Sequence, residues 1–203
     1  MLLVNNGSTD ATAEVVQELL PSYPSVRVVT LQPNQGYGGG IIEGLRQANS
    51  DYIGWTHADL QTDLGDVSRA YDLLSRQGFA EDVFIKGHRR GRPLSDEVFT
   101  VGMSIFESLY LGAHLWDINA QPNIFSRSFF QSWSNPPTDF ALDLYALYWA
   151  HQKRLRLVRF DVHFPPRRHG TSKWNTGLAA KKKFIQRTLS FSKTLKQGLA
   201  QCS

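Results

Sequence analysis

Short apolar runs alternate with amphipathic stretches along the first half of this chain. Val26 to Leu31 is rich in β-branched residues, as strands are, whereas Ile41, Ile42 and Leu45 recur at helical spacing. The strands predicted in this half are residues 2–4, 26–31, 52–56 and 83–85. The helices predicted between them start at Ser8 or Asp10 and stop at Pro21, then cover about 39–48 and 64–77. This alternation indicates an α/β fold with a mostly parallel sheet and helices on both faces.

The second half has a looser pattern of the same kind. The elements predicted there are helices over 96–111 and 140–153, strands over 123–125 and 155–164, a mobile basic loop over 89–93, and a helix over 177–199. This last helix is long, amphipathic and basic. We therefore divide the chain into a domain over residues 1–175 and a C-terminal basic amphipathic helix over residues 176–203.

Charge is unevenly distributed, although the net charge is only +4. Residues 1–80 carry four Lys or Arg against nine Asp or Glu, a balance of −5. Residues 151–203 carry thirteen Lys or Arg and a single acid, Asp161, a balance of +12. This asymmetry favours a cation site in the first part and contacts with an anion in the second, such as a phosphate ligand, a membrane surface or nucleic acid.

Composition excludes two classes of protein. No apolar run reaches the roughly 20 residues that span a bilayer, and a single cysteine, Cys202, cannot form a disulfide framework. The lone cysteine favours a reducing compartment, and Met1 to Val4 runs into a turn without a secretion signal. We therefore expect a cytoplasmic protein.

His57-Ala-Asp59-Leu60-Gln61 follows the strand predicted over residues 52–56. An imidazole, a carboxylate and an amide oxygen at the end of a strand make a site suited to a divalent cation. The crevice beyond the strand ends is also where α/β sheets bind ligands. An isolated HxD is more often a polar loop whose Asp caps the next helix, so the other motifs decide.

Three further segments have candidate chemistry. Asn5 to Asp10 ends a strand and opens a helix, which suits a sugar nucleotide, although a turn and a helix cap also explain it. Gly36 to Gly40 lacks the full dinucleotide fingerprint, so its glycines are expected to allow close backbone approach. Arg167 to Lys173 gathers cations and a hydroxyl that suit a diphosphate, or forms a solvated basic loop.

Together these four motifs resemble those of family 2 glycosyltransferases, especially bacterial relatives of dolichol-phosphate mannosyltransferase. VNNGSTD is similar to the family's V-D-D/N-G-S-x-D, and NQGYGGGIIEGL to its N-x-G-x-G-x-A-x-x-x-G. HADLQ is similar to the metal-binding D-A-D-x-Q, and RRHGTSKW to R-x-x-G-x-S-K. Order and spacing match over about residues 2–175.

The resemblance implies a GT-A fold, a nucleotide-diphosphate sugar donor and a bound Mg²⁺ or Mn²⁺. It assigns Asp59 as the principal metal ligand, with His57 and Gln61 in the same site. The donor-binding residues that it implies are Asn5 and Asp10 at the nucleoside end and Arg167, Ser172 and Lys173 at the phosphates. On the acceptor side the implied catalytic carboxylate is Asp143, with Asp139 as its competitor.

The chain departs from the family pattern in three places. His57 replaces the first Asp of the metal motif, which tilts the site toward Mn²⁺ because imidazole is a softer ligand. Asn5 replaces an Asp that contacts the base in relatives. The family also begins with a strand and loop like V-I-P-x-Y-N-E, whereas Met1 falls inside its second strand. We therefore expect bare edges on the strands at 2–4 and 52–56, and a chain that is incomplete for catalysis and prone to aggregate or to pair with another chain.

The implied reaction is an inverting transfer of a sugar to a polyprenyl phosphate or a saccharide, in cell-envelope or polysaccharide synthesis. A saccharide hydroxyl needs a carboxylate to take its proton, whereas a phosphate is already anionic. The alternative is a catalytically impaired fragment that only binds the sugar nucleotide. The basic C-terminal helix favours a peripheral position at the inner face of the membrane, or is a packed helix with a solvated face. Its few aromatic residues argue against a nucleic-acid partner.

Overall fold

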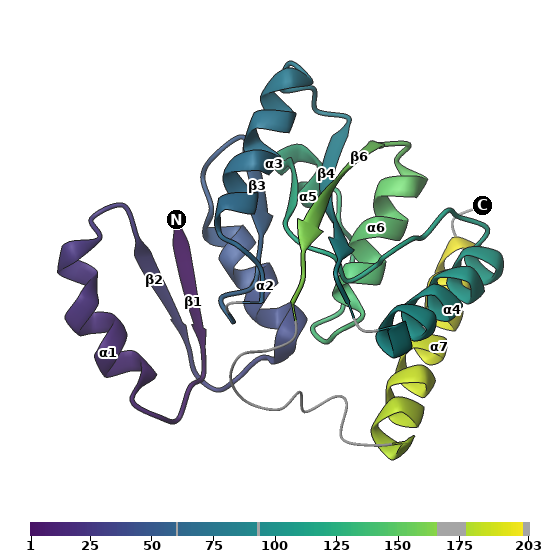
Figure 1. The fold of residues 1–203 in the computed structure, drawn as a ribbon, viewed down its shortest axis with the longest axis horizontal. Coiled ribbons are helices and arrows are strands. Elements are labelled where there is room, and N and C mark those ends of the chain that lie inside the picture. Colours follow the sequence, from purple (N-terminus) through teal and green to yellow (C-terminus); the bar gives the residue numbers. More distant parts are fainter. Residues whose placement is uncertain (60, 93, 166–177, 201–203) are drawn as a thin grey trace.

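Two parallel strands and the helix between them form a unit at one end of the molecule (Figure 1). The computed structural model describes residues 1–203 except for 60, 93, 166–177 and 201–203. β1 (Leu2–Asn6) pairs with β2 (Arg27–Leu31) from Leu2 opposite Arg27 to Asn6 opposite Leu31. The connection consists of α1 (Thr12–Leu19) and a 3₁₀ helix (Leu20–Ser22). No residue of α1 is buried, and Val15 and Leu19 on its apolar face are exposed.

Four strands form a second, mixed sheet in the order β3-β5-β4-β6. They are β3 (Tyr52–Trp55), β4 (Val83–Arg90), β5 (Asn123–Ser126) and β6 (Arg156–His163). β6 runs parallel to β4, whereas β5 lies between β3 and β4 and runs antiparallel to both. The α/β fold is confirmed, and the sheet is mixed because the short strand β5 enters from the opposite direction.

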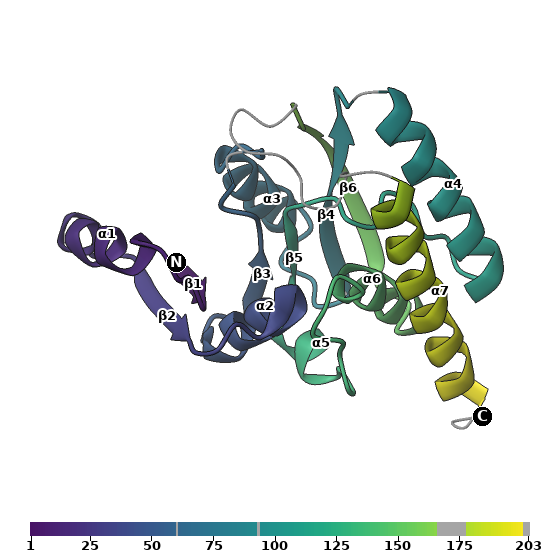
Figure 2. The same cartoon turned by 90° about the horizontal axis from the view of Figure 1, so that it is seen from below.

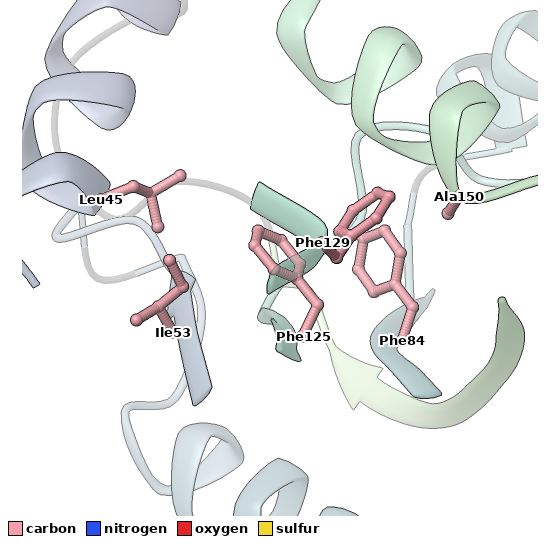
Figure 3. Packing of buried hydrophobic residues seen from close by; sticks show 6 residues of the cluster. All are labelled: Leu45, Ile53, Phe84, Phe125, Phe129 and Ala150. Carbon is pink, nitrogen blue, oxygen red and sulfur yellow. The ribbon is translucent and has the colours of Figure 1, made fainter. Parts of the chain in front are cut away.

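Helices cover both faces of this sheet. They are α2 (Gly36–Gln47), α3 (Gly65–Arg76), α5 (Arg127–Gln131) and α6 (Leu142–Gln152). Successive side chains of a strand point to opposite faces, so Phe84 packs with α2, α5 and α6 while Val83 and Ile85 pack against α3. Figure 3 shows the first of these clusters, which consists of Leu45, Ile53, Phe84, Phe125, Phe129 and Ala150.

α4 (Leu94–Leu111) and α7 (Leu178–Ala200) lie side by side at the end of the molecule opposite to α1 (Figures 1 and 2). Phe191 and Leu195 of α7 pack against a buried cluster that includes Leu111 of α4 and Tyr148 of α6. The helices predicted over 96–111 and 177–199 are therefore found, and the described part of α7 packs on α4 and α6.

α2 packs against both β1 and β3 and so joins the two sheets. Two of its glycines permit close contacts. A Cβ on Gly44 would lie 2.8 Å from Val4 Cγ2 of β1, and a Cβ on Gly38 would lie 2.5 Å from the Pro137 carbonyl oxygen in the segment before α6. The prediction that the glycine-rich run allows close backbone approach is confirmed.

Four strands have an edge without a partner strand within the described residues, and β1 and β3 are two of them. β1 pairs only with β2, and β3 pairs only with β5. Both views place β1 between β2 and the second sheet, so its free edge is on the side of α2 and β3 (Figures 1 and 2). These are the two strands whose edges the sequence predicted to be bare.

One local prediction is wrong, and one short helix was not predicted. Arg89 and Arg90 belong to β4 instead of a mobile loop, because β6 continues to pair with β4 as far as Arg90 opposite His163. The helix α5 was not predicted, since five residues are too few to show a helical period. Ser126 caps it by accepting a hydrogen bond from the Phe129 N–H.

Candidate functional site

The carboxyl ends of β1 and β3 lie against the amino end of α2. Asn6, the last residue of β1, donates from Nδ2 to the Gly36 carbonyl (2.7 Å) and accepts from the Gln35 N–H (2.9 Å). The ring of Tyr37 in the first turn of α2 lies 5.6 Å from the imidazole of His57, which follows β3. The structure thus brings together the first three of the motifs predicted from the sequence.

The candidate nucleoside-binding residues make local hydrogen bonds in the first turn. Asn5 is buried, and its Oδ1 accepts from the Ser8 N–H at 3.1 Å. Asp10 is exposed, and its Oδ1 accepts from the Thr12 N–H (3.1 Å) and hydroxyl. The side-chain bond from Thr12 lowers the pKa of Asp10. Asp10 therefore stabilises the start of α1 whether or not it binds a ligand.

A chain of hydrogen bonds connects His57 to the acceptor-side carboxylate Asp143. The Tyr37 hydroxyl donates to Asp143 Oδ2 at 2.7 Å. Gln121 Nε2 lies 2.9 Å from the Tyr37 hydroxyl oxygen and 2.9 Å from His57 Nε2. Phe140 stacks on the Tyr37 ring with centroids 4.4 Å apart. The metal motif and the acceptor-side motif are therefore parts of one network.

Gln121 links the two ends of this network. Since the Tyr37 hydroxyl donates to Asp143, its oxygen accepts from the Gln121 amide nitrogen. The same nitrogen lies 2.9 Å from His57 Nε2, whose role in the contact depends on the tautomer of the imidazole.

Lys86 lies beneath this network with its ammonium group fully buried. It donates to the Ala120 carbonyl and to Asn123 Oδ1, each at 2.7 Å. Burial lowers the pKa of Lys86 to about 7, against the attraction of the Asp143 carboxylate. Burial also raises the pKa of Asp143, while Lys86 and the Tyr37 hydroxyl oppose that rise. Each of the two charges thus stabilises the other in the interior.

The sequence did not predict Lys86, Tyr37 or Gln121 as site residues. A signal existed for Lys86, because it continues the apolar run of β4, where an ammonium group needs buried partners. Tyr37 and Gln121 had no such signal. Their partners lie 106 and 84 residues away along the chain.

Three buried atoms of the network have no hydrogen-bond partner within the described residues. They are Asp143 Oδ1, Gln121 Oε1 and Asn123 Nδ2. Since buried polar atoms are nearly always bonded, the network has unused capacity to bind a polar group or water.

A buried ion pair between Arg89 and Asp117 lies farther along β4. Arg89 donates to Asp117 from its backbone N–H (2.7 Å) and from Nε (2.8 Å). Burial raises the pKa of Asp117, but the charge and hydrogen bonds of Arg89 together with the charge of Lys86 outweigh burial, so the pKa is lowered. Arg159 of β6 donates to the Gly87 and Trp116 carbonyls. These contacts hold the loop before β5 against β4 and β6.

The two acceptor-side candidates differ in access. Asp143 is only 2% exposed and lies behind Tyr37. Asp139 is exposed, and its Oδ1 accepts from the Ala141 N–H at 3.0 Å near the start of α6. Asp139 can therefore meet a ligand from solvent, whereas Asp143 can do so only if Tyr37 moves.

Asp59 is exposed beyond β3, and its Oδ1 accepts from the Gln61 N–H at 3.2 Å. The described part of the chain contains no group of three or more His, Cys, Asp or Glu that could hold a metal by itself. One carboxylate with an amide oxygen nearby nevertheless fits Mg²⁺ or Mn²⁺, because such ions complete their coordination with water and substrate phosphates. Arg167, Ser172 and Lys173, expected at those phosphates, lie outside the described residues.

Comparison with known proteins identifies the relatives of this chain. The family model described as Glycosyl transferase family 2 matches residues 1–110. A dolichyl-phosphate beta-glucosyltransferase of Dictyostelium discoideum is 28% identical over 78 residues, which are 37% of this chain and 24% of that protein. A poly-beta-1,6-N-acetyl-D-glucosamine synthase of Staphylococcus epidermidis is 23% identical over 175 residues, covering 82% of this chain and 41% of that protein. The chain thus spans less than half the length of these relatives.

Solved structures share the fold. A glucosyl-3-phosphoglycerate synthase of Mycobacterium tuberculosis, in complex with Mn²⁺, UDP-glucose and phosphoglyceric acid, has a TM-score of 0.67 and 18% identity over 95% of this chain and 68% of that one. A mannosyltransferase of Pyrobaculum calidifontis, in complex with GDP-Man and Mn²⁺, has a TM-score of 0.59 and 18% identity over 82% and 48%. These likenesses confirm the GT-A fold. Since the family model matches more than half of the sequence, the chain belongs to glycosyl transferase family 2.

Proposed function

We propose that this chain transfers a sugar, with inversion, from a nucleotide-diphosphate sugar to a polyprenyl phosphate in cell-envelope or polysaccharide synthesis. The observation that supports this most is the single hydrogen-bonded network that runs from His57, beside Asp59, through Gln121 and Tyr37 to Asp143. This network supports the proposal because it links the residue beside the proposed metal ligand to the proposed acceptor-side carboxylate. We further propose that the enzyme acts at the inner face of the membrane.

On the donor side, Asp59 and Gln61 would hold Mg²⁺ or Mn²⁺, with His57 in the same site. The ion, when bound, neutralises charge that builds on the leaving nucleoside diphosphate. Relatives solved with Mn²⁺ and UDP-glucose support this assignment. His57 Nε2 lies 2.9 Å from Gln121 Nε2, so a metal that used this atom would displace the amide.

The nucleoside and the diphosphate of the donor would be bound by residues from the two ends of the domain. Asn5 and Asp10 would line the nucleoside end, next to the start of α2. Arg167, Ser172 and Lys173 would bind the diphosphate, since cations and a hydroxyl stabilise the negative charge of a departing phosphate.

The burial of Asp143 favours a phosphate acceptor. A carboxylate that is hydrogen-bonded to Tyr37 and attracted to Lys86 is poorly placed to take a proton from a sugar hydroxyl. A phosphate oxygen is already a nucleophile and needs no general base. If the acceptor is a saccharide, the exposed Asp139 is the better-placed base, and Asp143 orients Tyr37.

Donor binding tests the first part of this proposal. Wild type, Asp59→Ala and His57→Ala are titrated calorimetrically with UDP-glucose and with GDP-mannose, with Mn²⁺ or with a chelator. We expect Asp59→Ala to lose metal-dependent binding and His57→Ala to weaken it, while Asp72→Ala, an exposed carboxylate of α3, binds as wild type. Unchanged affinity of Asp59→Ala in the presence of Mn²⁺ would refute the metal assignment.

A transfer assay tests the acceptor. Incubation with labelled donor and either a short polyprenyl phosphate or an oligosaccharide should give product with the phosphate. Asp139→Asn should leave that reaction unchanged and should abolish transfer to a saccharide if saccharides are used. Donor binding without transfer or hydrolysis would instead support the fragment that only binds sugar nucleotides.

A further inference from the structure

Two polar side chains of α4 lie on the inside of the domain. Ser104 and Glu107 face the rest of the domain and are almost completely buried, at 1% and 0% exposure. Glu107 Oε2 accepts from the Ser192 hydroxyl of α7 at 2.5 Å, and burial raises the pKa of Glu107. A surface helix normally turns such residues to solvent.

The opposite face of α4 is apolar and open. Its large side chains are Val98 (66% exposed), Ile105 (52%), Phe106 (40%) and Leu109 (80%). Val98, Ile105 and Leu109 are separated by seven and four residues, so they form one stripe along the helix. None of the four belongs to the buried clusters of the described part of the chain. The stripe therefore contributes nothing to this protein's own core.

The exposed apolar face of α4 indicates an apolar partner outside the domain. Large contiguous apolar surface is uncommon on a soluble monomer and marks an interaction site. Gly102 lies within the same face, and a Cβ added to it would meet nothing within 4 Å. Within the described residues, nothing covers the stripe at Gly102.

The neighbouring helix supplies the complementary charge. α7 contains six Lys or Arg and no acidic residue, and no Asp or Glu occurs after Asp161. Lys193 and Lys196 are exposed. Lys196 reaches α4 itself, where Nζ donates to the Tyr110 carbonyl at 3.2 Å and lies 4.6 Å from the Tyr110 ring centroid. The Tyr110 ring in turn stacks on Phe106 with centroids 5.7 Å apart, so Lys196 lies at the margin of the stripe.

We propose that the stripe Val98–Ile105–Phe106–Leu109 docks on an anionic lipid surface, with the lysines of α7 on the lipid phosphates. An apolar helix face bordered by cations is the combination that inserts at the boundary between headgroups and acyl chains. The described residues contain no helix that is both long and apolar enough to cross a membrane, so this contact is peripheral. The inference rests on the proposed position at the membrane and assigns the surface that makes the contact. Vesicle binding is measured without sugar transfer, so a failure of the surface is distinct from a failure of the reaction.

Vesicle flotation without donor or acceptor tests the surface. We expect wild type to float with vesicles of phosphatidylcholine and 30% phosphatidylglycerol, to float poorly with phosphatidylcholine alone, and to dissociate in high salt. Ile105→Gln/Leu109→Gln should weaken binding at least tenfold. Lys193→Gln/Lys196→Gln should weaken it about thirtyfold. The control Val15→Gln/Leu19→Gln removes two exposed apolar side chains from α1 at the opposite end of the molecule. It should bind as wild type.

A labelled variant reports on the stripe directly. With Cys202 replaced by Ser, an environment-sensitive fluorophore on Leu109→Cys should brighten with anionic vesicles, and one on Leu19→Cys should not. The proposal is overturned if wild type does not bind anionic vesicles, or if Val15→Gln/Leu19→Gln loses binding as much as Ile105→Gln/Leu109→Gln does. A dimer in ultracentrifugation that Ile105→Gln/Leu109→Gln dissolves, without vesicle binding, would also overturn it and identify a second copy as the occupant.

Discussion

Lys86 brings an ammonium group into the middle of the second sheet, and its titration should be visible in the protein's stability. Burial lowers its pKa from 10.5 to about 7. Between these values the unfolded chain binds a proton that the folded chain lacks. The free energy of unfolding should therefore rise with pH over this window, by at most about 1.4 kcal/mol per unit. Below pH 7 both states are protonated and this slope disappears.

Urea unfolding at pH 7.5, 8.5 and 9.5 measures this effect. Wild type should gain stability over the series relative to Lys86→Met, which has no group to titrate at this position. Lys153→Met removes an exposed lysine and should follow wild type. Identical pH dependence in wild type and Lys86→Met would show that the buried amine does not titrate near neutrality.

Lys173 is predicted to bind the donor diphosphate. A charge-assisted hydrogen bond to phosphate contributes about 1.5–3 kcal/mol, so Lys173→Ala should weaken nucleoside-diphosphate binding about tenfold or more. The melting temperature should barely change, and Lys153→Ala is the matched control for charge. A large loss of stability with intact binding would mean that Lys173 is structural.

At the scale of helices and strands, the glycines of α2 leave no room for a side chain, whereas a glycine of α4 does. A Cβ on Gly38 would lie 2.5 Å from the Pro137 carbonyl oxygen, whereas one on Gly102 of α4 meets nothing within 4 Å. Gly38→Ala should therefore destabilise the protein markedly. Gly102→Ala should stabilise it by about 0.4–1 kcal/mol, because alanine has less freedom in the unfolded chain.

Thermal unfolding of the two variants distinguishes these effects. The expected outcome is a lower melting temperature for Gly38→Ala and a slightly higher one for Gly102→Ala. Similar shifts in both would contradict the close packing of α2 against the segment before α6.

Most helices and strands could be predicted because their signals are local. The apolar runs of β2 and β3 and the helical spacing in α2 and α3 are contained in each segment. The direction of β5 and the extension of β4 through Arg90 depend on partner strands that are distant in the sequence, so the pattern did not show them. The motif of His57 and Asp59 could be predicted because its residues lie two positions apart in the sequence. Gln121 could not be predicted, because it contacts His57 from 64 positions away.

At the scale of the whole molecule, the two sheets should differ in stability. β1 and β2 form a two-stranded sheet, and α1 has no buried residue. Two strands are marginal without a covered apolar face, whereas β4 is paired on both edges and fully buried from Val83 to Ile85. The first unit should therefore open without the rest.

Hydrogen exchange followed by mass spectrometry measures this difference. Peptides from β1, α1 and β2 should exchange much faster than peptides from β4 and β6. A nucleotide sugar with Mn²⁺ should slow exchange in the first unit if Asn5 and Asp10 contact the donor. Uniform protection of both sheets would show that they unfold together.

The hydrogen bond from Tyr37 to Asp143 joins α2 to α6 across 106 residues of sequence. α2 begins at the turn that we propose for the donor, and Asp143 is the carboxylate that we propose for the acceptor side, so a ligand that shifts one helix would change the energy of the other. Such coupling is reciprocal: the factor by which the donor changes acceptor affinity must equal the factor by which the acceptor changes donor affinity. Replacing Tyr37 with Phe would cut this link while keeping the stacked ring, and the two substrates would then bind independently.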